Sequence, residues 1–79
     1  MSARIAWERR NGVLILADAE AEFRATVSKG VGDRGKPLYR IDVETYGRPL
    51  SAPRYASRQA AARAHVEATY YAVTGRVLA

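Results

Sequence analysis

The dipeptide Asn11-Gly12 constrains the fold of this chain most, because it lies between two short runs rich in apolar residues, Ile5 to Arg10 and Val13 to Ala17. A type I′ turn requires positive φ at both central residues, which Asn and Gly tolerate, so the pattern predicts a two-residue β-hairpin. The predicted cross-strand pairs are Arg10 with Val13, Arg9 with Leu14, Glu8 with Ile15, Trp7 with Leu16 and Ala6 with Ala17. Successive side chains point to opposite faces, so Trp7, Leu14 and Leu16 mark the core side.

Two more strands are predicted after the hairpin. Apolar and polar residues alternate from Phe23 to Ser28 and again from Tyr39 to Glu44, which is typical of half-buried strands. The glycine-rich segment from Gly30 to Pro37 is expected to join them as a loop. The sheet is predicted to end at three turn-forming residues, Gly47, Pro49 and Pro53.

A helix is predicted from Arg58 to Val73, with Ser57 as its N-cap and Gly75 at its end. The residues at helical spacing on one side are Ala62, Val66, Thr69, Tyr70 and Val73. This side is expected to cover Trp7, Leu16, Phe23, Ile41 and Val43. The predicted fold class is therefore α+β, a four-stranded antiparallel sheet with one C-terminal helix packed on one face, in the order ββββα. Residues 1–79 are expected to form a single domain.

The sheet face without the helix is the leading candidate for a contact surface. It is predicted to carry Glu8, Arg10, Arg24, Arg40, Asp42 and Glu44 around Val13, Ile15 and Thr26. The alternative is an ordinary solvated face, which antiparallel sheets commonly have.

The charge of the chain favours an acidic partner. Thirteen Lys or Arg residues against eight Asp or Glu give a net charge of +5 and a pI of about 10.1. Arg outnumbers Lys by eleven to two, and the planar guanidinium suits phosphate and carboxylate groups. A GC-rich genome is the alternative source of the arginines.

The predicted loops add further contact candidates. Lys29, Arg34 and Lys36 lie in or beside the glycine-rich loop, and Tyr46 and Tyr55 flank the segment with Arg48 and Arg54. A solvated loop, or packing against the helix end, is the alternative for each. The complete set of candidate partner-binding residues is Arg10, Arg24, Lys29, Arg34, Lys36, Arg40, Tyr46, Arg48, Arg54 and Tyr55.

Motifs that would indicate catalysis or a cofactor do not have the required surroundings. Gly30 to Gly35 matches G-x-G-x-x-G, but a strand rather than a helix is predicted to follow it. One histidine, His65, zero cysteines and scattered carboxylates give no metal-ligand spacing. No enzyme, cofactor, metal or small-molecule substrate is therefore expected. Without cysteines or an apolar run of about 20 residues, the chain is predicted to be cytoplasmic in a bacterial host cell, with no membrane association.

The order of strands and helix, with an arginine-bearing open face, resembles the sheet-and-helix DNA-binding domains of the integrase N-terminal and AP2 types. This resemblance implies a small basic DNA- or RNA-binding module that uses the open sheet face. The double-stranded RNA-binding domain is similar in its sheet and last helix, but this chain has no room for the leading helix.

In size, in the Ala- and Arg-rich segment from Arg58 to Ala72 and in the lack of enzymatic motifs, the whole chain resembles small anti-CRISPR proteins of phages and other mobile elements. The resemblance implies a non-enzymatic inhibitor that binds a Cascade subunit of a type I CRISPR effector complex, the Cas7 backbone first, and blocks access of target DNA. A charge of +5 excludes simple imitation of DNA, so the inhibitor would occlude the site. Arg24, Arg40, Arg48 and Arg54 would then meet acidic patches on the effector.

Overall fold

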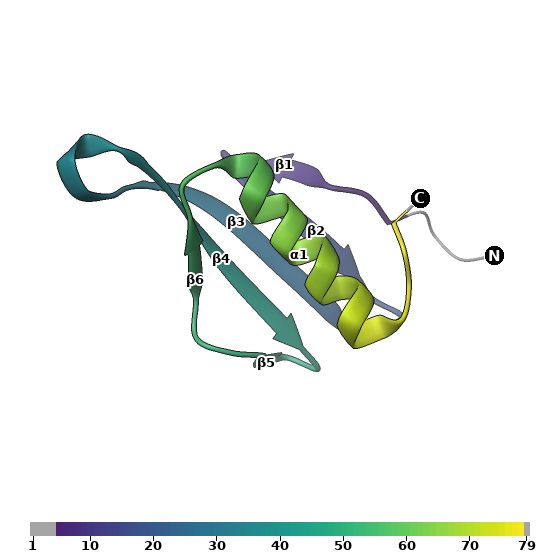
Figure 1. The fold of residues 1–79 in the computed structure, drawn as a ribbon. Coiled ribbons are helices and arrows are strands. Elements are labelled where there is room, and N and C mark those ends of the chain that lie inside the picture. The colour runs from purple at the N-terminus through teal and green to yellow at the C-terminus, as the bar shows by residue number, and fades with distance from the viewer. Residues whose placement is uncertain (1–4, 79) are drawn as a thin grey trace.

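The computed structural model describes residues 5–78 and shows an α+β fold, an antiparallel sheet with one C-terminal helix (Figure 1). The elements in order are β1 (Glu8–Arg10), β2 (Val13–Asp18), β3 (Phe23–Val31), the short 3-10 helix η1 (Asp33–Gly35), β4 (Pro37–Thr45), β5 (Arg48–Pro49), β6 (Arg54–Ala56) and α1 (Gln59–Thr74). Strands β1 to β5 are neighbours in chain order, and β6 also pairs with β4. The predicted α+β class, an antiparallel sheet with one C-terminal helix, is confirmed, but residues 5–78 form six strands rather than the four predicted.

The first hairpin confirms the predicted register. Asn11 and Gly12 have φ values of 49° and 78°, as the type I′ turn requires. Strand β1 pairs with β2 through Glu8 with Ile15, Arg9 with Leu14 and Arg10 with Val13. Because β1 begins at Glu8, the predicted pairs of Ala6 and Trp7 lie outside this ladder.

Strands β3 and β4 form a ribbon that is longer than expected. Each has nine residues, and the pairing runs from Phe23 with Thr45 to Val31 with Pro37. The predicted loop of residues 30–37 is therefore reduced to residues 32–36. Figure 1 shows the distal part of this ribbon extending beyond the helix, which gives the molecule an elongated shape of 46 × 22 × 19 Å.

The segment after β4 returns to the sheet, which corrects the prediction that Gly47, Pro49 and Pro53 end it. Strand β5 pairs with the end of β4, and Leu50 donates its backbone N–H to the Val43 carbonyl at 2.8 Å. Strand β6 then pairs with the first half of β4, where Arg54 lies opposite Ile41. Proline is tolerated in such short edge strands because one side of the backbone needs no ladder partner.

Helix α1 begins one residue later than predicted and has a different N-cap. The cap position is Arg58, with an extended backbone at φ −130° and ψ 142°, and no side chain caps the helix. The prediction of Ser57 as the N-cap is therefore wrong. At the other end Gly75 adopts the left-handed conformation at φ 72° and donates its N–H to the Tyr71 carbonyl at 2.8 Å, as predicted.

The helix covers one sheet face and forms the core with it. The buried apolar residues are Leu14, Leu16, Phe23, Ala25, Val27, Ile41, Ala62, Val66 and Tyr70. Trp7 and Val43 pack at the margin of this core, half-buried. Val73 was expected in the packed helix face but is 42% exposed, whereas Tyr70, one turn earlier, is buried.

Candidate functional site

The open sheet face, opposite α1, carries equal numbers of positive and negative side chains. Directly opposed residues of an antiparallel pair share a face, so the register identifies its members. The charged residues on this face are Glu8, Arg10, Arg24, Arg40, Asp42 and Glu44. Three cations and three carboxylates cancel formally, so this face offers no net charge to an acidic partner.

The arginines of the open face also have acidic neighbours. Arg10 Nη2 lies 3.4 Å from a Glu8 carboxylate oxygen, and Arg40 Nε lies 3.0 Å from an Asp42 carboxylate oxygen. Arg24 lies directly opposite Glu44 in the ladder. These pairs are solvent-exposed and stabilise the fold little, but they reduce the charge available to a partner.

The distal ribbon brings three other predicted residues together. Lys29 lies on the helix side of β3, and Arg34 and Lys36 lie in the exposed turn at the ribbon tip. The turn closes through the Gly32 N–H, which donates to the Lys36 carbonyl at 2.7 Å. Arg34 has φ 59°, an uncommon conformation for a residue with a side chain, and Gly35 follows at φ 72°.

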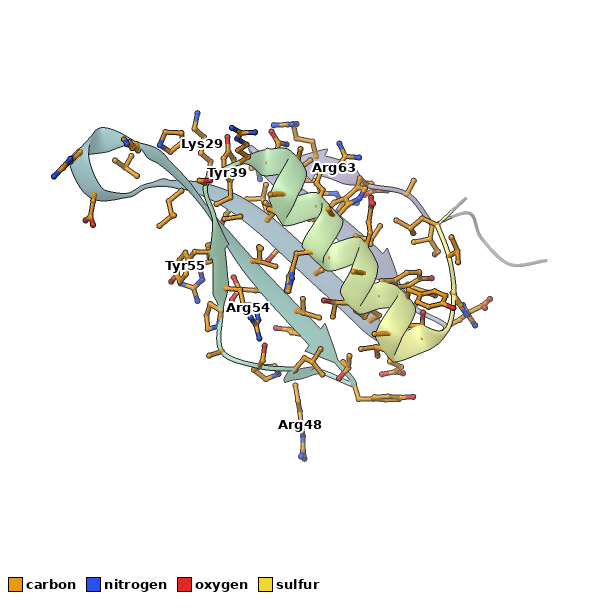
Figure 2. The ribbon with its side chains drawn as sticks, in the orientation of Figure 1. Lys29, Tyr39, Arg48, Arg54, Tyr55 and Arg63 are labelled. Atoms are coloured by element: carbon orange, nitrogen blue, oxygen red, sulfur yellow. The ribbon has the colours of Figure 1, made fainter. Side chains whose placement is uncertain are left out.

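The start of α1 adds cations on the helix side of the sheet. Arg9 lies opposite Leu14, and Lys29 lies opposite Tyr39, so all four side chains share the helix face. Arg9, Lys29 and Tyr39 line a shallow pocket of about 170 Å³ together with Gln59, the first residue of α1. Figure 2 shows Lys29, Tyr39 and Arg63 beside the start of the helix.

The first turn of α1 contains no carboxylate to offset this positive charge. Arg58 occupies the cap position, and Arg63 stacks over the Trp7 ring with its guanidinium carbon 5.4 Å from the ring centroid. Trp7 in turn donates from Nε1 to Glu67 at 2.8 Å. The partial positive charge of the helix N-terminus points into the same region.

Charge is thus divided along the length of the molecule. We call residues 8–15, 26–42 and 54–66 the basic end, because they contain nine Lys or Arg residues and three carboxylates. The remaining described residues form the acidic end, with three Arg and five carboxylates. Among residues 5–78, seven cations of the basic end have no carboxylate within 4.0 Å. These seven are Arg9, Lys29, Arg34, Lys36, Arg54, Arg58 and Arg63.

The other predicted contact residues do not form one cluster. Tyr46 is 73% exposed, in the turn between β4 and β5, and Arg48 follows it at the acidic end. Arg54 and Tyr55 are adjacent in β6 but belong to opposite faces, because Arg54 pairs with Ile41 and Tyr55 with Arg40. Figure 2 shows Arg48 well separated from Lys29.

Three cations of the basic end were missed by the sequence prediction, namely Arg9, Arg58 and Arg63. The signal for Arg9 was present, since the hairpin register places it on the helix side of the sheet. Arg58 and Arg63 lie at the start of the predicted helix, where basic residues are unfavourable because of the helix dipole. This unfavourable position was the signal that could have marked them as binding residues.

At the acidic end, charged side chains interact with other groups of the fold. Asp18 is 1% exposed and accepts hydrogen bonds from the Tyr70 hydroxyl at 2.7 Å and from Arg76 Nη1 at 2.9 Å. Burial raises the pKa of Asp18, but the hydrogen bonds from Tyr70 and the Ala21 N–H, together with the Arg76 charge, leave that pKa below its ordinary value. Burial and the nearby Asp18 carboxylate raise the pKa of Tyr70. This cluster ties the segment after α1 to the sheet.

Within residues 5–78 no group of three or more metal-ligating side chains comes together, and no helix is long and apolar enough to cross a membrane. No family model, curated protein or solved structure matches the chain. The arrangement of charge is the feature of the described residues that points to a function.

Proposed function

We propose that this chain is a non-enzymatic binding protein that docks an acidic macromolecular surface through its basic end. The observation that carries the proposal is the group of seven cations that have no acidic partner in the described part of the chain, gathered on the helix side and the ribbon tip. Folding leaves their charge available, whereas it neutralises that of the open sheet face. Opposed potentials of this kind increase association rates and orient the partners.

Two forms of partner meet this description. One is the phosphate backbone of a nucleic acid. The other is an acidic patch on a protein assembly, and the resemblance to anti-CRISPR proteins gives it a specific form, a Cascade subunit such as the Cas7 backbone. In both cases the contact residues are expected to be the unpaired cations rather than the arginines of the open face.

The test compares two variants that remove the same charge from neighbouring positions on opposite faces. The variant R9Q with K29Q changes the helix side, and R10Q with R40Q changes the open face. The probes are a 20-base-pair duplex DNA and a purified type I effector complex, each immobilised and tested at about 0.1 M salt. We expect the helix-side variant to lose roughly ten- to a hundredfold in affinity for the bound probe, as two ionic contacts would imply.

The open-face variant should lose less than about threefold, because Arg10 and Arg40 lie on the opposite face and are already ion-paired with Glu8 and Asp42. A larger loss in the open-face variant would move the contact surface to the open sheet face. If neither probe is bound by the unaltered protein, the proposed function is wrong.

A further inference from the structure

The distal part of the β3–β4 ribbon, residues 29–37, projects as an arm. Its shape helps to distinguish between the possible acidic partners. Residues 29–37 are exposed apart from a half-buried Gly32, and the apolar side chain of Val31 is 79% exposed. The helix begins beside Lys29 and Tyr39, so nothing in the described part of the chain covers the ribbon beyond them.

The arm is narrow because glycines occupy two of its positions. Gly30 lies opposite Leu38, and Gly32 lies so near Leu38 that an added Cβ would come within 3.3 Å of the Leu38 Cβ. Paired strands are about 4.8 Å apart, so the backbone of a two-stranded ribbon, with its outward N–H and C=O groups, is roughly 10 Å across. From Lys29 to Gly32 it extends by about 10 Å at the usual rise of a strand.

These dimensions agree with those of the major groove of B-form DNA. That groove is about 12 Å wide and 8.5 Å deep and admits a two-stranded β-ribbon. The tip of the arm carries Arg34 and Lys36 against a single carboxylate, Asp33. At the base of the arm, Arg9, Lys29 and the residues at the start of α1 provide a second group of cations.

We propose that the partner is double-stranded DNA, with the β3–β4 ribbon entering the major groove. Arg34 and Lys36 at its tip would contact the phosphates that border the groove, and the cations at its base would contact the flanking phosphates. This inference rests on the proposed function and specifies its partner. Duplex RNA fits less well, because the major groove of A-form RNA is deep and too narrow for side chains to read. Binding to an acidic protein surface would explain the positive charge but would not explain the thin projecting arm.

The first experiment measures binding of the full chain to three labelled probes by fluorescence anisotropy. The probes are a 20-base-pair DNA duplex, one of its single strands and an RNA duplex of the same sequence. We expect DNA duplex affinity to exceed the other two by about tenfold or more. It should fall roughly 10³-fold between 50 and 200 mM salt if five or more cations contact phosphates.

A matched pair of variants then tests whether the arm contacts the DNA. In R34Q with K36Q, the slope of log affinity against log salt should decrease by about 1.8, because each lost phosphate contact contributes about 0.9. The control R24Q with R48Q removes the same charge from the acidic end and should leave the slope unchanged. Equal slopes in the two variants would overturn the role of the arm.

Methylation by dimethyl sulfate tests the groove, because guanine N7 lies in the major groove. The bound protein should protect guanine N7 within the site, and binding without protection would overturn the inference. Equal affinity for all three probes would also overturn it. If the effector complex alone is bound, and binding depends on Arg9 and Lys29, the inference fails but the proposed function stands. If no probe is bound, both fail.

Discussion

The two ends of the molecule use charged residues in opposite ways. At the acidic end, Asp18 is buried and accepts hydrogen bonds from Tyr70 and Arg76, so its charge contributes to folding. At the basic end, seven cations have no acidic partner within the described residues, and their charge is left for another molecule. Mutations at the acidic end should therefore change stability, and those at the basic end should change binding.

The largest expected effect is that of D18A. It leaves the buried Tyr70 hydroxyl without its acceptor and Arg76 without its closest carboxylate, since only Glu20 remains at 3.5 Å. We expect the free energy of unfolding to fall by about 3 kcal/mol, measured by urea denaturation. A loss below about 1 kcal/mol would show that the acidic end does not depend on this cluster.

Acidification should produce a smaller loss through the same carboxylate. The pKa of Asp18 is lowered in the folded protein, so the unfolded chain binds the proton more readily. The stabilisation is present above the ordinary value of 3.8 and is lost as pH falls through the lower folded value. The raised pKa of Tyr70 has the opposite effect at alkaline pH. Its stabilisation is present below pH 10, the ordinary pKa of tyrosine, and is lost as the pH rises through the higher folded value. Thermal melts from pH 2 to 11 should show both losses, and D18A should lack the acidic one.

Y70F is expected to cost about 1 to 2 kcal/mol, less than D18A, because Asp18 keeps Arg76 and the Ala21 N–H as donors. The ring stays in place against Phe23, whose centroid is 5.0 Å away, so packing is retained. Denaturant unfolding of both variants gives the comparison. A greater loss for Y70F than for D18A would show that the Tyr70 hydroxyl stabilises the fold through more than its hydrogen bond to Asp18.

At the basic end, stability and binding should change in opposite directions. Arg58 has N-cap geometry without a capping side chain, so R58D is expected to raise the free energy of unfolding by about 1 kcal/mol. The same substitution removes a cation from the binding surface and should weaken binding of the duplex. R58Q, which removes the charge without a strong capping group, is the control for stability. Destabilisation by R58D would show that Arg58 contributes to the fold.

The smallest expected effect is that of R9Q with K29Q on stability. Neither residue has an ion pair among residues 5–78, so the free energy of unfolding should change by less than about 0.5 kcal/mol. Circular dichroism melts measure this. A loss above 1 kcal/mol would mean that these cations stabilise the fold, and any binding defect would then have to be interpreted again.

The parts of the fold that were predictable from sequence are the local ones. Asn11-Gly12 determines its own turn and therefore the register of both neighbouring strands, and Gly75 ends the helix for a similarly local reason. Strands β5 and β6 were not predictable, because Gly47, Pro49 and Pro53, in or directly before them, are typical of turns. Their pairing with β4 also depends on the completed sheet. The role of Asp18 was also not predictable, because its partner Tyr70 is 52 residues away in the sequence.

The candidate site was predictable only in part, because Arg9, Arg58 and Arg63 were missed. Seven of the ten predicted residues belong to the basic end, but Arg10 and Arg40 among them are ion-paired on the open face. The strand alternation already placed Arg40 and Asp42 on the same face and hence within reach of each other. The sequence did not predict that Arg9 and Lys29 lie close to the start of α1, because this depends on how the helix crosses the sheet.

The most direct test of the account is a map of the amides that respond to the partner. The ¹⁵N-labelled chain would be titrated with the 20-base-pair DNA duplex and followed by two-dimensional NMR. We predict the largest shift changes at Arg9, Lys29, Arg34 and Gln59, and small changes at Arg24 and in β5. Changes concentrated on Arg24, Thr26 and Asp42 would show that the open sheet face is the contact surface and would contradict the account.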